Sequence, residues 1–165
     1  NLQGLQLNSS NPQFTNSSYH TVEVTNSVIK FGRQTIEFNN NYIVFYVWHS
    51  VPGYSAFGSY TGNGSPSGPF VYLGFKPAFV LLKHSTGSNQ HWWLYDNKRD
   101  PNNPVINDLN AHATDAENTA SENAIDFLSN GVKMRDTTSN NINYSGTTYI
   151  YMAFAEMPLK YATAR

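Results

Sequence analysis

The amino-acid sequence predicts an all-β protein, built as an antiparallel β-sandwich or jelly roll. Aromatic residues make up 15% of the chain, with eleven Tyr and ten Phe, beside many Asn, Ser, Thr and Gly. This is the composition of strands joined by tight turns. Short apolar or alternating segments recur along the chain, and only residues 110–124 resemble a helix. The apolar positions of that segment are all Ala and bury little area, so we expect a short helical turn or a loop there.

Strand signals follow one another from residue 21 to residue 157. Most of these segments alternate apolar and polar residues or cluster β-branched and aromatic ones, which favours strands. Residues 42–48 (YIVFYVW) form an unbroken apolar run, as expected for a strand that is buried on both faces. The other expected strands are residues 21–25, 28–32, 34–38, 70–75, 78–84, 91–96, 125–128, 132–135 and 148–157.

Turn residues separate these strands. Residues 61–69 (TGNGSPSGP) are rich in Gly, Pro and Ser and predict a loop, and residues 84–90 (HSTGSNQ) are expected to close a hairpin. Asn130-Gly131 lies between two apolar runs and is a strong hairpin signal, because a type I′ turn needs positive φ at both central residues. Short turns of this kind indicate antiparallel neighbours.

Two parts of the chain share a pattern that suggests a repeat. YIVFYVWHSVPGY (residues 42–54) and YIYMAFAEMPLKY (residues 149–161) both begin with Tyr-Ile, end in Tyr and carry a Pro near the end. Similarity in a fixed order indicates tandem modules. We therefore expect residues 1–56 to be the C-terminal half of a preceding β module, or N-terminal strands of the same sandwich, and residues 57–165 to be a complete sandwich module. The alternative is that two apolar strands merely look alike.

Composition and charge exclude several classes of partner. Charged residues make up only 13% of the chain and the net charge is −1, so the basic footprint of nucleic-acid or anionic-membrane binding is missing. No apolar run approaches the roughly 20 residues of a membrane helix. The absence of Cys excludes disulfides and thiolate metal sites. The chain begins with Asn and shows no signal peptide, so we expect a fragment of a longer polypeptide.

The segment HWWLYD carries the densest group of chemically capable side chains. With a period of two, His91, Trp93 and Tyr95 share one face of the strand, and Trp92 and Leu94 share the other. We expect the second face in the core and the first on the outside. An aromatic ribbon of this kind packs against a neighbouring module or subunit, stacks on a sugar ring, or belongs to an ordinary core. The sequence leaves these three interpretations open.

The turn that follows, DNKRD, contains the carboxylates Asp96 and Asp100. Two carboxylates serve as acid and base in glycoside hydrolysis, but here Lys98 and Arg99 stand between them. Neighbouring cations lower the pKa of a carboxyl group, which is the opposite of what a general acid needs. We therefore interpret Asp96, Arg99 and Asp100 as structural, with an Asp–Arg ion pair and an Asx turn before Pro101.

Other catalytic and metal-binding patterns are missing from the sequence. The five His residues have no His partner at i+2 or i+4 and form neither HxH nor HExxH. The acidic residues do not match a calcium-binding loop. Neither a nucleophile elbow nor a phosphate-binding glycine motif occurs. The sequence therefore predicts a protein that is not an enzyme and that carries no metal site and no cofactor.

Several motifs together resemble a known kind of module. YTGNG, GFKPAFVL, DNKR, FLSNG and the terminal TYIYMAFAE occur in this order between residues 46 and 165. They are similar to motifs of a module in tail-fibre-like and other structural proteins of bacteriophages, especially marine and cyanobacterial ones, where it often occurs in tandem and closes the chain. The resemblance implies a jelly-roll or concanavalin-like β-sandwich and a place in the virion. It implies no catalytic residues.

From this resemblance we expect a distal fibre or spike module on the virion surface that adheres to host-surface glycan. The expected partners are further copies of the chain, in a homotrimer, and other virion proteins. The candidate ligand or interface residues are Trp93 and Tyr95 with His91 beside them, Asn63 in its loop, and residues 136–146. The alternatives are a head decoration or head-fibre protein that binds the capsid and, less favoured, a polysaccharide depolymerase.

Overall fold

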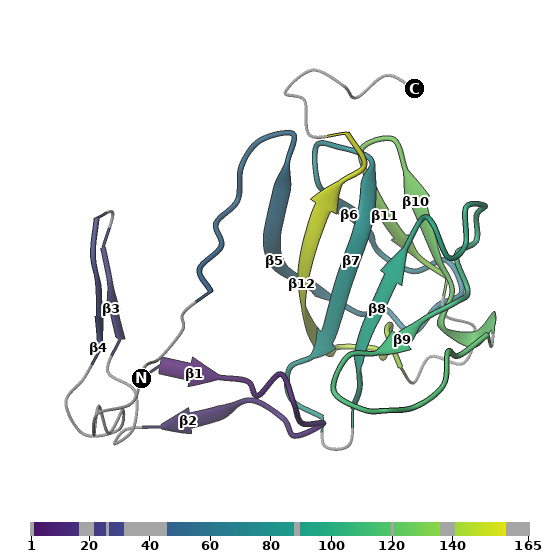
Figure 1. The fold of residues 1–165 in the computed structure, drawn as a ribbon. Helices are drawn as coiled ribbons and strands as arrows, with labels where there is room; N and C mark the ends of the chain where they lie inside the picture. Colours follow the sequence, from purple (N-terminus) through teal and green to yellow (C-terminus); the bar gives the residue numbers. More distant parts are fainter. Residues whose placement is uncertain are drawn as a thin grey trace.

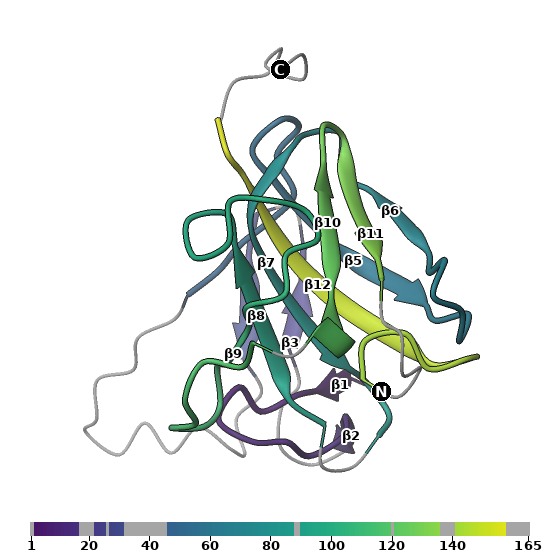
Figure 2. The same cartoon turned by 90° about the vertical axis from the view of Figure 1, so that its right-hand side faces the viewer.

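The chain in the computed structural model is built from antiparallel β-strands, with one short 3-10 turn and no α-helix among the described residues (Figure 1). The structure describes residues 2–16, 22–25, 27–31, 46–87, 90–119, 121–135 and 141–157. Two of the sheets pack face to face, as Figures 1 and 2 show, and enclose a shared core. The predicted all-β antiparallel sandwich is confirmed.

The larger sheet of the sandwich has five strands and forms one wall of the core. Its spatial order is β5, β12, β7, β8 and β9, and every neighbouring pair is antiparallel. The last strand of the chain, β12, therefore lies between the first strand of this sheet and β7. The strands are β5 (Ser55–Thr61), β12 (Thr148–Ala155), β7 (Pro77–His84), β8 (Trp92–Asp96) and β9 (Leu109–Asn110).

The smaller sheet has three strands and covers the inner face of the larger one. Its strands are β10 (Ile125–Leu128), β11 (Gly131–Met134) and β6 (Phe70–Tyr72), again all antiparallel. A 3-10 turn, η1 (Ser121–Asn123), precedes β10. This short turn lies in the Ala-rich segment 110–124, where the sequence predicts a helical turn or a loop rather than a helix.

The core lies between the two sheets and consists of the inward-pointing residues of each strand. Trp93, Tyr95 and Tyr149 are its largest members. The rings of Tyr60 and Tyr149 stack with centroids 5.0 Å apart, and the buried Tyr60 hydroxyl donates to the Ile142 carbonyl oxygen at 2.6 Å. Such a bond removes most of the cost of burying a polar group. The remaining core residues are Val71, Leu73, Phe75, Val80, Leu82, Val105, Ile125, Phe127, Val132, Met134, Ile142 and Ala153.

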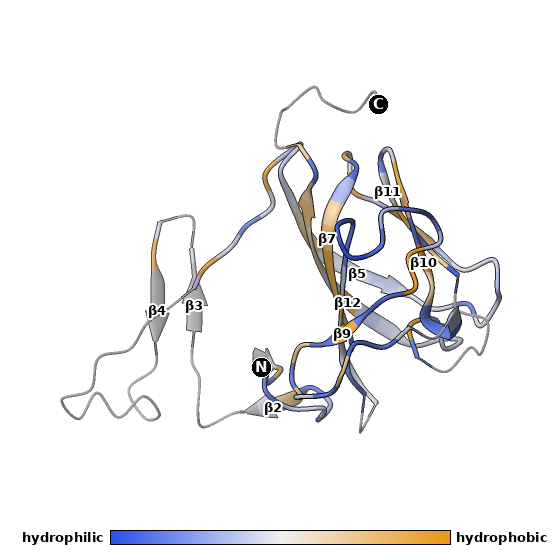
Figure 3. Ribbon diagram, turned by 45° about the vertical axis from the view of Figure 1, so that its right-hand side comes forward, coloured by the Kyte–Doolittle hydropathy of each residue, from blue (hydrophilic) through white to orange (hydrophobic). Residues whose placement is uncertain are grey.

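Two further pairs of short strands precede the sandwich. β1 (Leu2–Gly4) pairs with β2 (Phe14–Asn16), and β3 (Val22–Val24) pairs with β4 (Ile29–Phe31), both antiparallel. Figure 1 shows β3 and β4 standing apart from the sandwich. Figure 3 shows that hydrophobic residues follow β7 along much of its length.

The segment between β1 and β2, which we call the N-terminal arm (residues 6–13), touches the larger sheet at one end. The backbone N–H of Gln13 donates to the Ser85 carbonyl oxygen at 2.7 Å, and that of Gln90 donates to the Ser10 carbonyl oxygen at 3.2 Å. These bonds tie the arm to both sides of the connection between β7 and β8. The described residues include no helix that is long and apolar enough to cross a bilayer.

Most of the predicted strands are present, but the sequence prediction errs on either side of residue 50. Residues 34–38 and 42–45 lie outside the described residues. Tyr46–Trp48, the described end of the run predicted as a buried strand, is not a strand, and all three residues are exposed.

β5, which follows, was not predicted because Gly and Ser interrupt its apolar pattern. It forms because β12 pairs with it along its whole length, and the module boundary predicted after residue 56 falls inside it.

The hairpin predicted at Asn130-Gly131 is present, but its turn lies one residue earlier. The two residues between the paired strands are Ser129 and Asn130, and Gly131 is the first residue of β11 without a positive φ. A Cβ on Gly131 would collide with the Val71 carbonyl oxygen and lie 2.9 Å from the Phe70 ring. The glycine therefore serves the close approach of β6 rather than the turn.

Replacing Gly131 with Ala is expected to destabilise the sandwich by about 1–3 kcal/mol, the usual cost of forcing an extra group into a packed site. The free energy of unfolding is measured by urea titration. Ser129→Ala, in the exposed hairpin loop, is the control and is expected to stay within about 0.5 kcal/mol of the wild type. Equal stability of the two variants would contradict the assignment of Gly131 to a packed strand.

Candidate functional site

The face of β8 that carries Trp93 and Tyr95 points into the core, whereas the sequence predicts it on the outside. Trp93 is 2% exposed and Tyr95 is 0% exposed, and both belong to the core. This corrects the outer-face position predicted for Trp93 and Tyr95, whereas His91 precedes β8 and is partly buried. A period of two separates the faces of a strand but does not say which one points inward when both are apolar. Trp93 is therefore a core residue, and neither sugar stacking nor subunit packing fits its position.

Trp92 lies on the outer face of β8 and is nevertheless buried. Its indole Nε1 donates to the Gln6 carbonyl oxygen at 3.0 Å, so the N-terminal arm lies over the ring. Lys83, on the neighbouring strand β7, pairs with Trp92 and is 0% exposed. The Lys83 ammonium donates to the carbonyl oxygens of Ser10 at 3.2 Å and Gln90 at 2.7 Å. The arm thus closes one end of the outer face of the larger sheet.

Burial lowers the pKa of Lys83 from 10.5 to about 8. Its ammonium also lies 6.0 Å from the centroid of the Trp92 ring, within the range of a cation–π contact. Backbone carbonyl groups satisfy the hydrogen bonds of the cation but lack the full negative charge of a carboxylate. The loss of water around the ammonium therefore dominates its pKa.

Two imidazoles adjoin this buried lysine. The rings of His91 and His112 lie 5.1 Å apart, and the His91 ring lies 5.9 Å from that of Trp93. Burial lowers the pKa of His112, and electrostatic interactions with His91 and Lys83 lower it further. Across the part of the chain that the structure describes, no group of three or more His, Cys, Asp or Glu side chains is placed to hold a metal ion. The His91 ring therefore adjoins the rings of Trp93 and His112, next to the start of β8.

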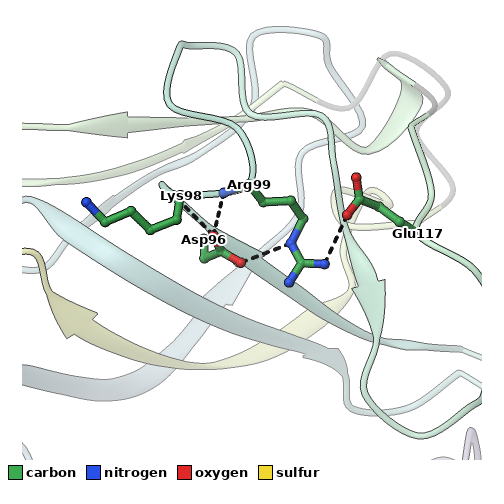
Figure 4. A network of polar contacts seen from close by, with 4 residues as sticks. All are labelled: Asp96, Lys98, Arg99 and Glu117. Atoms are coloured by element: carbon green, nitrogen blue, oxygen red, sulfur yellow. Dashed lines mark hydrogen bonds and ion pairs between the residues drawn. The ribbon is translucent and has the colours of Figure 1, made fainter.

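The turn after β8 is held by a network of polar contacts, shown in Figure 4. Asp96 Oδ1 accepts from the backbone N–H groups of Lys98 at 2.9 Å and Arg99 at 2.7 Å, and Asp96 Oδ2 accepts from Arg99 Nε at 3.0 Å. The guanidinium also pairs with Glu117 Oε2 at 3.1 Å. Burial works to raise the pKa of Asp96, but the hydrogen bonds from Arg99 and Lys98 outweigh it, and the pKa lies below its usual value. The ion pair and the Asx turn expected from the sequence are both present.

The loop beyond this turn is fixed by two more side chains. Asp100 Oδ2 accepts from the backbone N–H of Ile106 at 2.9 Å. Asn103 pairs with the backbone of Phe127 in both directions, with its Nδ2 donating at 2.9 Å and its Oδ1 accepting at 2.8 Å. Asp100 therefore anchors the loop to Ile106, in keeping with the structural role expected for it.

Asn63, a predicted ligand residue, uses its side chain to hold its own loop and a second loop together. Its Nδ2 donates to the Ser67 carbonyl oxygen at 3.1 Å, and its Oδ1 accepts from Ser65 N at 3.0 Å and Asn143 Nδ2 at 2.9 Å. Asn143 is fully buried, and its Oδ1 accepts a hydrogen bond from the backbone N–H of Asn63 at 2.8 Å. These contacts join the loop after β5 to the loop before β12.

An exposed pair of aromatic residues stands before β5. Tyr46 is 75% exposed and Trp48 is 52% exposed, and their rings stack with centroids 5.9 Å apart and an angle of 15° between planes. We call these residues the aromatic pair. The next residue, His49, is tied to β5 because its carbonyl oxygen accepts from Ser55 Oγ at 2.9 Å. Sequence reasoning missed the pair, since an unbroken apolar run carries no periodicity that separates a buried strand from an exposed segment.

A second group of aromatics lies on the outer face of the larger sheet. The rings of Tyr54, Phe57 and Phe79 each approach that of Phe154, with centroids 6.0, 5.9 and 5.9 Å away. Tyr54 is 47% exposed and the three Phe side chains are partly exposed. We call these four residues the outer aromatic patch. It occupies the end of the sheet opposite to the N-terminal arm, because Phe79 pairs with Asp96 whereas Lys83 pairs with Trp92.

Residues 2–158 match the model of a protein family described as a domain of unknown function, DUF7483. The chain belongs to this family. The DUF7483 match includes the N-terminal arm together with both sheets of the sandwich and crosses the boundary predicted after residue 56. Comparison with curated proteins and comparison with solved structures each found no match.

Trp93→Ala is expected to destabilise the protein by about 3–5 kcal/mol, because it leaves a cavity in the core. Tyr72→Ala removes an aromatic ring that is 69% exposed and is expected to cost no more than about 0.5 kcal/mol. Chemical unfolding of both variants measures the difference. A small loss of stability in Trp93→Ala would show that the outer-face prediction was right after all.

The stability of the protein is expected to rise with pH above about 8 because of Lys83. The folded pKa of Lys83, about 8, is lower than the unfolded value of 10.5, so the unfolded state binds more protons between these two pH values. Raising the pH from 7 to about 9.5 should increase the free energy of unfolding by about 2 kcal/mol relative to Lys83→Met. Urea unfolding of both proteins at both pH values provides the test. Parallel pH profiles would contradict the burial of a charged Lys83.

Proposed function

We propose that this chain is a structural module of a phage virion, a distal fibre or spike domain that adheres to glycan on the host surface. The order of its motifs, from YTGNG to TYIYMAFAE, supports a place among fibre-like structural proteins. The observation that carries the adhesive role is the aromatic pair. Tyr46 and Trp48 expose two stacked rings to solvent on a segment that is tied to the edge of the sandwich.

Aromatic rings of this kind suit carbohydrate. A pyranose ring has an apolar face of C–H groups, which packs on a flat aromatic surface, while the Tyr hydroxyl and the Trp N–H supply polar contacts at its rim. Each such contact is weak by itself. Several copies of the chain in a symmetric oligomer, with a homotrimer as the simplest case for a fibre, raise the effective concentration of the second and third contacts.

A second candidate function is attachment to the capsid as a head decoration or head-fibre protein. The outer aromatic patch favours it, because partly exposed Phe57, Phe79 and Phe154 form an apolar surface suited to another protein. Gold-labelled antibody against the chain separates the two candidates by electron microscopy of intact virions. Label on the fibres supports adhesion, and label on the head supports decoration.

Adhesion is tested with beads that carry many copies of the chain and an array of immobilised bacterial lipopolysaccharides and capsular polysaccharides. Trp48→Ala is expected to reduce retention by about tenfold or more, because loss of one stacking contact is multiplied across the copies. The binding signal on the array is the measurement.

Tyr72→Ala is the matched control, since Tyr72 is a similarly exposed aromatic on the smaller sheet. It is expected to bind like the wild type. Retention that falls equally in both variants, or an array on which the wild-type beads bind no polysaccharide, argues against glycan adhesion through the aromatic pair.

A further inference from the structure

A small polar pocket lies at the end of the sandwich where β7 begins and where β8 and β12 end. Its volume is about 220 Å³. The strand register brings these ends together, because Phe79 pairs with Asp96 and Ala155 pairs with Pro77. We call it the end pocket, and it is lined by Lys76, Asn97, Lys98, Asp100, Pro101, Asn103, Val105, Phe127 and Glu156.

One wall of the end pocket is an ordered set of charged and amide groups. Lys76 Nζ pairs with Glu156 Oε2 at 2.7 Å, and Asn97 Nδ2 donates to Glu156 Oε1 at 2.9 Å. The backbone supports the same arrangement, since the Glu156 N–H donates to the Lys76 carbonyl oxygen at 2.9 Å and the Asn97 N–H donates to that of Ala78 at 3.0 Å. These groups are therefore held in place by the protein itself.

The remaining wall and the base come from the loop after β8 and from β10. Asp100 and Asn103 are fixed by their bonds to the backbone, as described above. Val105, 1% exposed, and Phe127, 5% exposed, lie at the base of the pocket and offer little surface to a ligand. The lining of the pocket is thus mainly polar, with charged and amide side chains from three parts of the chain.

The balance of groups in the end pocket defines the ligand that fits. The two ammonium groups of Lys76 and Lys98 match the two carboxylates of Asp100 and Glu156, so a neutral ligand creates no unpaired charge. A carboxylate offers about four lone-pair sites, and Asp100 and Glu156 retain acceptor capacity beyond their bonds within the protein. Donors and acceptors around one small space suit hydroxyl groups, each of which both donates and accepts.

We propose that the end pocket binds a single neutral sugar ring, the terminal residue of a glycan. Its volume is smaller than the roughly 300–1,000 Å³ of pockets for drug-sized ligands, so it accommodates one ring and not an oligosaccharide. The charged and amide groups of the lining take the hydroxyls of the ring, and Val105 and Phe127 close the base of the pocket. The choice of ligand class rests on the proposed glycan adhesion, whereas the pocket is separate from the aromatic pair.

The test is titration of the uniformly ¹⁵N-labelled full chain with glucose, galactose, mannose and, as a charged comparison, glucuronate. At least one neutral hexose is expected to shift the backbone amide signals of Lys76, Asn97 and Asp100 at concentrations up to tens of millimolar. Glu156→Ala and Lys98→Ala are each expected to weaken that binding by about tenfold, the effect of losing one hydrogen bond to a charged group. Lys98→Ala keeps the backbone N–H that caps Asp96, so the turn is preserved.

Glu122→Ala is the matched control, because Glu122 is an exposed carboxylate in η1 outside the pocket, and it is expected to bind as the wild type does. The proposal is overturned if no neutral hexose shifts these amides, if only glucuronate does, or if both pocket variants bind like the control. Each titration uses free sugars and no polysaccharide array. Sugar binding here with no retention on the array therefore rejects the proposed function alone, and the reverse result rejects the end pocket alone.

Discussion

The pairing of β12 with β5 on one side and β7 on the other is the interaction on which the rest of the structure depends. β12 contacts strands from much earlier in the chain, with seven residue pairs on each side. Its inner face places Tyr149 and Ala153 in the core, and its outer face carries Phe154 into the outer aromatic patch. β5 lies at the edge of the sheet with β12 as its strand neighbour, so its polar, Gly-containing sequence becomes a strand through this pairing.

The larger sheet is apolar on both faces, and each face is covered by a different means. The smaller sheet closes the inner face, where Trp93 and Tyr95 are buried. On the outer face the N-terminal arm covers Trp92 and Lys83 at one end. The arm brings neutral carbonyl oxygens to a buried ammonium group, and the lowered pKa of Lys83 records how incompletely they replace water. The arm therefore covers this end of the outer face at the cost of removing water from the Lys83 ammonium.

The surfaces that suit binding lie where this covering stops. The aromatic pair precedes the edge strand β5, and the end pocket lies beyond the ends of β7, β8 and β12. Loops and strand ends on a rigid sandwich are common places for binding residues, because the strands hold them without enclosing them. The turn after β8 both stabilises the local structure and contributes to the end pocket. Asp96 and Arg99 stiffen the turn, and Asn97, Lys98 and Asp100 line the pocket.

The sequence by itself determined the fold class, most of the strands and the chemistry of the turn after β8, because these depend on local alternation, on turn residues and on charges four or fewer positions apart. It did not determine the inward face of β8, since Trp92 and Trp93 are equally apolar and the covering elements come from distant parts of the chain. Nor did it show that Tyr46 and Trp48 are exposed, because an apolar run becomes a buried strand only where a partner strand meets it. The end pocket depends on tertiary structure alone: Lys76, Asn97, Phe127 and Glu156 are far apart in sequence, and strand register brings them to one end of the sandwich.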